Sequence, residues 1–209
     1  MKRVLVVAFF AVTSLAAFAA EPPGPAAKPD AGKAAPIAQQ VCVACHGSDG
    51  NSALPVNPNL AGQHAQYTTK QLANFKSGDR KNPIMSAMAA NLSPADMANL
   101  GAYFATQKPK PSAARDRELA EAGQKLYRAG NRATGLPACA GCHGPAGSGI
   151  PAEFPRLAGQ HADYVLAQLK SFRAWERSND SAKMMRMVAG KLSDGDMQAL
   201  AEYLSGLRP

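Results

Sequence analysis

The sequence has few of the features that would direct a protein to nucleic acid or into a membrane. Beyond residue 20 it contains no unbroken apolar run of the roughly 18 residues that a membrane-spanning helix needs. No run of lysine and arginine exceeds two residues or is interleaved with aromatic residues, so a nucleic-acid groove is not expected. No stretch alternates between apolar and polar residues as a half-buried strand would. Because 46% of the residues are hydrophobic, these absences favour a globular helical protein.

The first 19 residues have the three parts of a secretory signal peptide. Lys2 and Arg3 form a charged start, residues 4–15 are apolar, and small residues ending at Ala19 form a cleavage site. We therefore expect a mature periplasmic protein, peripheral to the membrane at most, with an uncleaved membrane anchor as the alternative. Cleavage leaves 21 basic against 15 acidic residues, a net charge of +6 that favours acidic partner surfaces.

The rest of the chain divides into two halves set apart by proline-rich segments. Residues 20–36 are rich in proline, alanine, glycine and lysine, and we expect them to form a leader that does not pack. The prolines within residues 108–115 predict a linker, because proline cannot continue a helix. We therefore place an N-terminal domain at residues 37–107 and a C-terminal domain at residues 116–209.

The two halves are copies of one small helical domain. Residues 60–75 and 157–172 are identical at ten of sixteen positions, with a shift of 97 in numbering. Ser93 and Ser193 each stand three residues before an aspartate and an apolar helical face, which predicts a capped final helix in each half. Earlier helices are expected at residues 31–45, 64–78, 116–129 and 161–176. The sequence therefore predicts an all-α protein of two tandem domains.

Two short motifs carry the chemistry. Residues 42–46 and 139–143 both read C-x-x-C-H, the pattern for covalent attachment of a c-type haem. Two thiols three residues apart on one helical turn reach the two vinyl groups of a haem, and the adjacent imidazole of His46 or His143 lies under the iron. We therefore expect two covalently bound haem c groups, held by Cys42, Cys45, Cys139 and Cys142.

The same cysteines have three other interpretations: a thioredoxin-like redox pair, a zinc knuckle, or structural disulfides. A zinc site with two cysteines and one histidine lacks a fourth ligand, because the duplicated unit has no further cysteine. A redox C-x-x-C pair normally follows a strand, and the sequence shows none.

Each half also carries a methionine cluster about forty residues beyond its haem motif. The methionine sulfur is a soft ligand that favours ferrous iron, so His/Met ligation suits electron transfer at a positive potential. Counting back seven residues from the duplicated Leu-Ser pairs selects Met85 and Met185 as the distal ligands. Met88, Met184 and Met187 are then expected to pack against the haem. A neighbouring methionine is the alternative ligand.

These motifs, in this order and each followed by a PxLAGQHxxY segment, resemble the dihaem cytochrome c4 family across nearly the whole chain beyond Ala31. The resemblance implies two class I cytochrome c domains related by a pseudo-twofold axis, with haem propionates hydrogen-bonded across the interface. It also implies that the carbonyls of Pro58 and Pro155, each twelve residues beyond a haem histidine, accept the proximal imidazole N–H. The long leader departs from the family pattern.

The histidines of the duplicated LAGQHA segments, His64 and His161, have two interpretations. Either they are iron ligands, or each opens a helix. In the second interpretation the two helices present polar residues along one face, near a haem edge or the domain interface: Tyr67, Gln71, Tyr164 and Gln168.

The sequence offers two roles for each of three basic residues and one expectation for the single tryptophan. Arg80, Lys81 and Arg177 either neutralise haem propionates or are solvated. Trp175, for which the first half has Gly78, is expected to pack.

The sequence thus predicts an electron-transfer protein and not an enzyme, a monomeric dihaem carrier of single electrons whose chain positions and ligates the haems. The resemblance suggests a donor such as the cytochrome bc complex and an acceptor such as a haem-copper terminal oxidase, with no nucleic acid. One alternative is the cytochrome subunit of a dehydrogenase complex, for example a flavocytochrome. Another is a dihaem peroxidase, which needs a displaceable axial ligand, and a methionine in each half argues against it.

Overall fold

The fold, taken from a computed structural model, is described for residues 28–208. The predicted signal peptide (1–19) and the first part of the predicted leader lie outside this range. Within it the chain consists of helices and loops, with two isolated β-bridges and no longer strand. The prediction of an all-α fold of two tandem domains is confirmed.

The helices of the two domains follow the same order. The N-terminal domain contains α1 (Ala31–Ile37), the π-helix η1 (Ala38–Cys42), α2 (Val43–His46), α3 (Ala65–Ser77), α4 (Pro83–Ala89) and α5 (Pro94–Thr106). The C-terminal domain contains α6 (Arg117–Ala129), α7 (Ala140–His143), α8 (Ala162–Arg173), the 3-10 helix η2 (Ser181–Lys183), α9 (Met184–Ala189) and α10 (Asp194–Gly206). None of these helices is long and apolar enough to cross a membrane.

The first helix begins earlier than the predicted domain boundary. Helix α1 starts at Ala31, inside the segment 20–36 that we expected to be an unpacked leader, and its N-cap Asp30 accepts a hydrogen bond from the Gly32 N–H at 2.8 Å. Ala34 is fully buried in the N-terminal core. The boundary at residue 36 is therefore wrong. The small alanine side chains of α1 let it pack against α5. The boundary was misplaced because a segment with so few large apolar side chains does not look like a packed helix in the sequence.

The final helix of each domain begins with the predicted capping box. The Ser93 hydroxyl accepts a hydrogen bond from the Asp96 N–H, and the Asp96 carboxylate accepts one from the Ser93 N–H. Ser193 and Asp196 repeat this arrangement at the start of α10. The reciprocal bonds satisfy two backbone donors that a helix N-terminus otherwise leaves unpaired.

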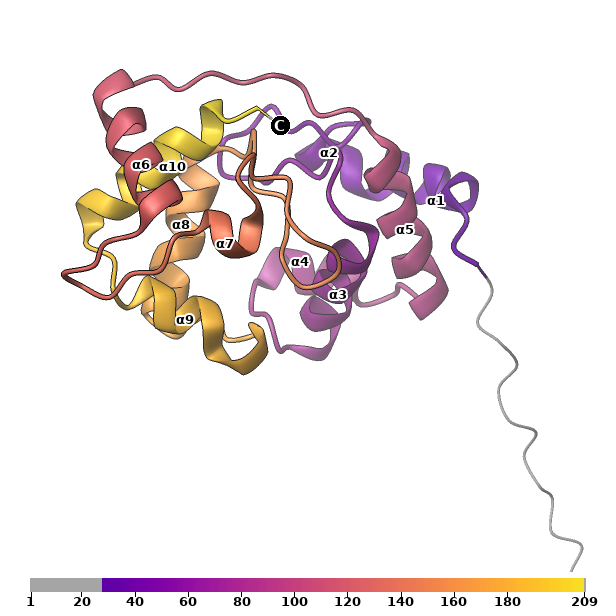
Figure 1. Cartoon of the computed structure of the whole chain (residues 1–209). Coiled ribbons are helices and arrows are strands. Elements are labelled where there is room, and N and C mark those ends of the chain that lie inside the picture. The colour runs from indigo at the N-terminus through magenta and orange to yellow at the C-terminus, as the bar shows by residue number, and fades with distance from the viewer. Residues whose placement is uncertain (1–27, 209) are drawn as a thin grey trace, which may run out of the picture.

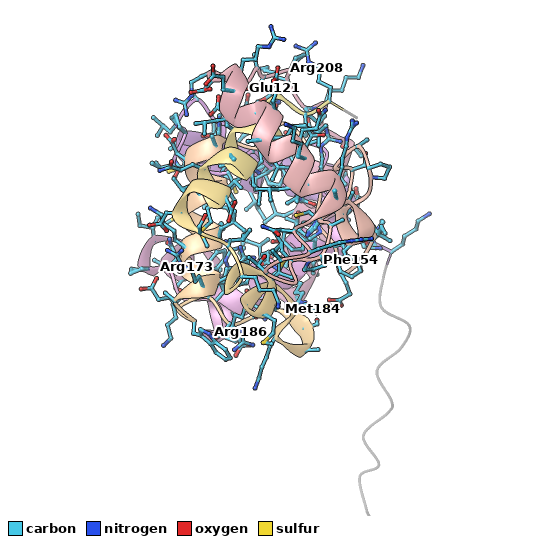
Figure 2. All side chains as sticks on the ribbon, turned by 60° about the vertical axis from the view of Figure 1, so that its left-hand side comes forward. Glu121, Phe154, Arg173, Met184, Arg186 and Arg208 are labelled. Carbon is cyan, nitrogen blue, oxygen red and sulfur yellow. The ribbon has the colours of Figure 1, made fainter. Side chains whose placement is uncertain are left out.

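The two domains lie side by side, and an extended segment between α5 and α6 runs along one edge of the molecule to join them (Figure 1). The far end of this segment is fixed by Glu202 of α10, which is buried and accepts hydrogen bonds from the N–H groups of Arg115 and Asp116. Charged side chains project outward over the molecule, among them Glu121, Arg173 and Arg208 (Figure 2).

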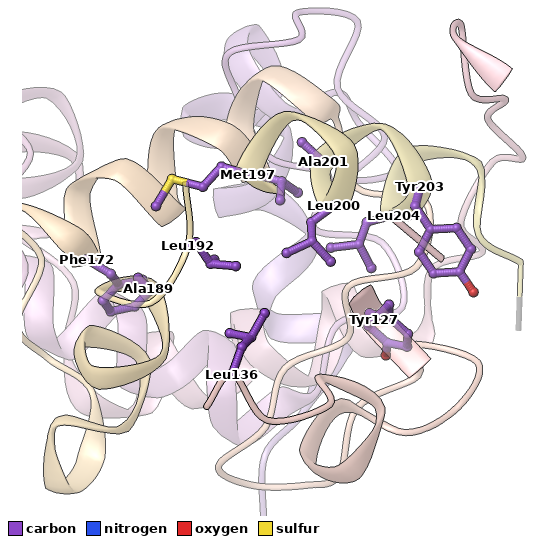
Figure 3. Packing of buried hydrophobic residues seen from close by; sticks show 11 residues of the cluster. Tyr127, Leu136, Phe172, Ala189, Leu192, Met197, Leu200, Ala201, Tyr203 and Leu204 are labelled. Atoms are coloured by element: carbon purple, nitrogen blue, oxygen red, sulfur yellow. The ribbon is translucent and has the colours of Figure 1, made fainter. Parts of the chain in front are cut away.

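The C-terminal core is formed where α6, α8, α9 and α10 converge (Figure 3). Its buried side chains include Tyr127, Phe172, Leu192, Met197 and Leu200. The buried cluster of the N-terminal domain is smaller and consists of Ala34, Ala38, Leu100 and Phe104. Each core is lined by further apolar side chains that are only partly buried.

Helices α6 and α10 cross so closely at Gly123 that a larger residue does not fit. A Cβ atom at this position would overlap the backbone carbonyl of Ala199. We expect Gly123→Ala to lower the free energy of unfolding by about 1–3 kcal/mol, the usual cost of overpacking a core. Thermal unfolding followed by circular dichroism measures the loss. Gly195→Ala, at an exposed position in the first turn of α10, is the control and should leave stability unchanged or raised. An unchanged Gly123→Ala protein would contradict this helix crossing.

The single tryptophan does not pack, contrary to expectation. The predicted helix over residues 161–176 ends at Arg173, and Trp175 follows in a left-handed conformation with φ of 63°. This backbone turns the side chain outward, where it is 52% exposed and the Arg186 guanidinium lies 4.8 Å from the ring centroid. Gly78 holds the left-handed conformation at the corresponding place in the first domain, with φ of 87°.

Candidate haem sites and the interface between them

Each C-x-x-C-H motif forms a short helical turn, α2 or α7, that ends at its histidine. Cys42 and Cys139 are half-buried, whereas Cys45 and Cys142 are exposed, and none of the four is in a disulfide. Burial raises the pKa of the Cys42 thiol to about 11, and likewise that of Cys139 to about 11. A redox-active C-x-x-C pair needs a thiol with a lowered pKa, so the raised values argue against the thioredoxin-like interpretation.

The motif histidines turn inward and are almost completely buried. His46 is 7% exposed and His143 is 6% exposed. Burial is the larger influence on both side chains and lowers the pKa of each, against the opposing effect of a backbone hydrogen bond. Both imidazoles are therefore neutral at neutral pH.

The hydrogen bond on each ring defines which nitrogen is free. Nδ1 of His46 lies 2.9 Å from the Pro58 carbonyl oxygen, and Nδ1 of His143 lies 3.0 Å from that of Pro155. Because a carbonyl can only accept, Nδ1 carries the proton in each neutral ring and Nε2 keeps its lone pair. Nε2 is thus the nitrogen able to bind a metal, with the ring held in place by its other nitrogen.

The methionines differ in exposure in a way that matches the counting rule. Met85 on α4 and Met185 on α9 are half-buried, and Met185 packs against the same cluster as Cys139. Met88, Met184 and Met187 are exposed by 44%, 38% and 58%. The selection of Met85 and Met185 as distal ligands remains a prediction. It is supported by their partial burial, which distinguishes each of them from the exposed methionines of the same domain.

The residues around the motifs fit a large apolar group. Partly buried leucines at duplicated positions line both domains: Leu60, Leu72, Leu157 and Leu169. They stand beside a half-buried thiol and near a buried imidazole with a free Nε2, and each domain adds a half-buried thioether. Apolar walls with two thiols, an imidazole and a thioether are the donor set that a six-coordinate c-type haem requires.

The domains meet through contacts that come in reciprocal pairs. The side-chain amide of Gln160 pairs with the backbone of Asn59, and that of Gln63 pairs with the backbone of Arg156. The two pairings correspond to each other, because a shift of 97 relates Gln63 to Gln160 and Asn59 to Arg156. Such reciprocity defines an interface with twofold pseudosymmetry, and it accounts for the duplicated LAGQHA segments.

Arg80 and Arg177 lie inside this interface and are each 7% exposed, so the interpretation that they are solvated is wrong for both. Arg80 donates to the Tyr164 hydroxyl at 2.8 Å, and Arg177 donates to the Tyr67 hydroxyl at 2.9 Å. Lys81 is exposed. The two guanidinium groups also share two amide oxygens as acceptors, those of Gln71 and Gln168.

The two remaining histidines precede helices at this interface. His64 is the residue before α3 and His161 is the residue before α8. Nε2 of His161 lies 3.0 Å from the carbonyl oxygen of Ser52 in the other domain. His161 therefore contacts the N-terminal domain through Nε2, and His64 occupies the corresponding place in the duplication.

Comparisons with known proteins agree with these two sites. The family model described as Cytochrome c matches residues 30–108 and 120–208. Cytochrome c4 of Thiocapsa roseopersicina is 51% identical over 181 residues, which cover 86% of this chain and 92% of that protein. The crystal structure of reduced recombinant cytochrome c4 from Pseudomonas stutzeri aligns with a TM-score of 0.83 at 44% identity, covering 86% of this chain and all of that one.

A further relative has a different name. The thiosulfate dehydrogenase electron acceptor of Thiomonas intermedia (strain K12) is 38% identical over 182 residues, which cover 86% of this chain and 84% of that protein. This likeness spans both domains and both C-x-x-C-H motifs.

Proposed function

Because this chain belongs to the cytochrome c4 family of dihaem electron carriers, we propose that it works in the periplasm as a free carrier that delivers single electrons to a terminal oxidase. The observation that supports this role most strongly is the duplication of a complete donor set, two thiols, one buried neutral imidazole and one half-buried thioether in each domain. The signal-peptide pattern of residues 1–19 supports export.

The protein carries two covalently bound haem c groups. When bound, each haem supplies an iron that takes up and releases one electron. We assign covalent attachment to the four motif cysteines and axial ligation to His46, Met85, His143 and Met185. The buried histidines present a fixed Nε2, and the partly buried leucines exclude water from the site. These residues hold the ligands in one geometry, which lowers the reorganisation that accompanies a change of charge.

A second candidate function is the acceptor subunit of a dehydrogenase. The observation that favours it is the 38% identity to the thiosulfate dehydrogenase electron acceptor over both domains. An acceptor that stays with its dehydrogenase needs a large apolar interface, whereas a free carrier needs a weak, polar encounter. Salt dependence separates the two.

We expect the second-order rate of electron transfer to a purified haem-copper oxidase to fall about tenfold or more between low and high salt. The side chains of the mature polypeptide sum to +6 and steer the carrier towards acidic patches, and screening over ~10 Å at 0.1 M salt removes most of that steering. Stopped-flow absorbance of the reduced protein measures the rate. Reduction of the oxidised protein by a small uncharged hydroquinone over the same salt series is the control and should change little.

Two outcomes would argue for the subunit instead. One is a rate that does not depend on salt. The other is a complex with a dehydrogenase that survives gel filtration in high salt, as a large apolar interface would.

A further inference from the structure

A single peptide group lies between each haem histidine and the opposite domain. The carbonyl of Pro58 accepts the hydrogen bond from His46 Nδ1 at 2.9 Å. The N–H of the same peptide group belongs to Asn59, and it donates across the interface to Oε1 of Gln160 at 2.8 Å. The imidazole of the N-terminal domain is thereby connected to a glutamine of the C-terminal domain through one peptide group.

The second domain repeats this connection in the opposite direction. The carbonyl of Pro155 accepts the hydrogen bond from His143 Nδ1 at 3.0 Å. The N–H of the same peptide group belongs to Arg156, and it donates to Oε1 of Gln63 at 2.9 Å. Each axial histidine is thus backed by an amide side chain from the other domain.

The two glutamine side chains are held so that the amide oxygen must face the peptide. Gln160 is 8% exposed, its Oε1 also accepts from the His161 N–H at 3.1 Å, and its Nε2 donates to the Asn59 carbonyl at 2.9 Å. Turning the amide over would oppose donor to donor at both N–H groups. Gln63 has the same exposure and the same three contacts.

We infer that Gln63 and Gln160 are positioning residues that act in trans, each setting the electron-donating strength of the axial histidine in the opposite domain. The inference rests on the proposed function, in that it takes His46 and His143 as iron ligands. A peptide N–H that donates a hydrogen bond makes the carbonyl of the same group a better acceptor, because hydrogen bonds in a chain polarise one another. A better acceptor at Nδ1 makes the imidazole more basic and favours ferric iron.

The direction of the effect follows from this chain of bonds. Without the Gln160 oxygen, the Pro58 carbonyl becomes a weaker acceptor and His46 a weaker donor to iron. The N-terminal haem is then easier to reduce. Without the Gln63 oxygen, the C-terminal haem is easier to reduce. In this arrangement the haem whose reduction changes lies in the domain that does not carry the mutation.

The experiment compares Gln160→Leu and Gln63→Leu with the wild-type holoprotein in an NMR-monitored redox titration, which follows each haem separately. In Gln160→Leu the ratio of reduced to oxidised N-terminal haem at a fixed potential should rise about two- to threefold, a magnitude in keeping with modest cooperative strengthening of one hydrogen bond. The C-terminal ratio should stay unchanged. Gln63→Leu should show the reverse pattern.

Two companion variants separate this role from a loss of packing. Gln160→Ala leaves room for a water molecule that can replace the lost acceptor, so its shift should be smaller than that of Gln160→Leu. Asn179→Ala removes a neutral amide that crosses the interface to Gln71 and Asn74 without reaching a peptide behind a haem histidine. It should leave both potentials unchanged. The Nδ1–H resonance of His46 in the reduced protein should also move upfield in Gln160→Leu alone.

The outcomes distinguish this inference from the function on which it rests. Three outcomes in protein with two haems per chain would overturn the trans role only. These are equal shifts in the potentials of both haems, a shift confined to the haem of the mutated domain, and no shift in either variant. Wild-type protein that lacks either haem, or in which the motif histidines do not ligate iron, would overturn the proposed function as well.

Discussion

Protein with both Cys139 and Cys142 replaced by alanine is expected to carry one covalent haem in place of two. The two thiols of this motif lie on one helical turn, Cys139 half-buried and Cys142 exposed, and neither is engaged in a disulfide. Without them no thioether bond can hold the C-terminal haem. A pyridine haemochrome assay per mole of chain measures the loss, and haem staining after denaturing electrophoresis shows whether the remaining haem is covalent.

The single replacement Cys142→Ala is the matched control. It keeps one thiol, so one thioether bond should still hold the haem through denaturing electrophoresis. The corresponding double replacement at Cys42 and Cys45 should also leave one haem, now in the C-terminal domain. A double variant of either motif that still carried two covalent haems would show that the motif cysteines are not the attachment sites.

Met85→Ala is expected to abolish about half of the weak sulfur-to-iron absorption near the red end of the oxidised spectrum and to lower the potential of the N-terminal haem. A thioether stabilises ferrous iron, so its loss favours the ferric state. Met185→Ala should do the same for the C-terminal haem, and the double variant should lose the absorption completely. Visible spectra and redox titration provide the two measurements.

Met88→Ala and Met187→Ala are the controls, because both side chains are exposed, by 44% and 58%. They should keep the absorption and both potentials. If either control lost half of the absorption while Met85→Ala or Met185→Ala kept it, the rule of counting back from the Leu-Ser pairs would have chosen the wrong methionine.

The helices and the motif residues were predictable because they depend on short-range patterns. The capping boxes at Ser93 and Ser193 are local signals, and so is the spacing of each C-x-x-C-H motif. The duplication added a second check, since each pattern had to occur twice with nearly the same shift. The helix beginning at Ala31 was predicted, but its packing into the N-terminal core was not, because alanine-rich sequence is compatible both with a packed helix and with an unpacked leader.

The interface was not predictable in the same way, since its contacts join residues about a hundred positions apart. Arg80 and Arg177 look like ordinary surface cations in the sequence, and only the folded pair of domains buries them. The strongest available signal was that the two LAGQHA segments are identical, although the start of a helix does not need six identical residues. The identity indicated that both segments have the same role, but not that Gln63 and Gln160 reach across to the peptides behind the haem histidines.

The trans connection also bears on how two similar haem sites can behave as one unit. The peptide behind His46 ends on Gln160, and Gln160 also takes the N–H of His161, the residue that contacts Ser52 in the N-terminal domain. In the inferred arrangement, a change in the hydrogen bonding of one domain is therefore passed to the ligand environment of the other through this chain of hydrogen bonds. Separating the domains would remove this influence from both sites.

The measurement that tests the central claim most directly is an anaerobic reductive titration of the oxidised protein, followed by visible absorbance and referred to the chain concentration. Two complete donor sets predict uptake of two electrons per chain, one at each haem, with full reoxidation when a terminal oxidase is added. Uptake of one electron or none per chain, or consumption of peroxide in place of reversible reduction, would contradict a dihaem single-electron carrier.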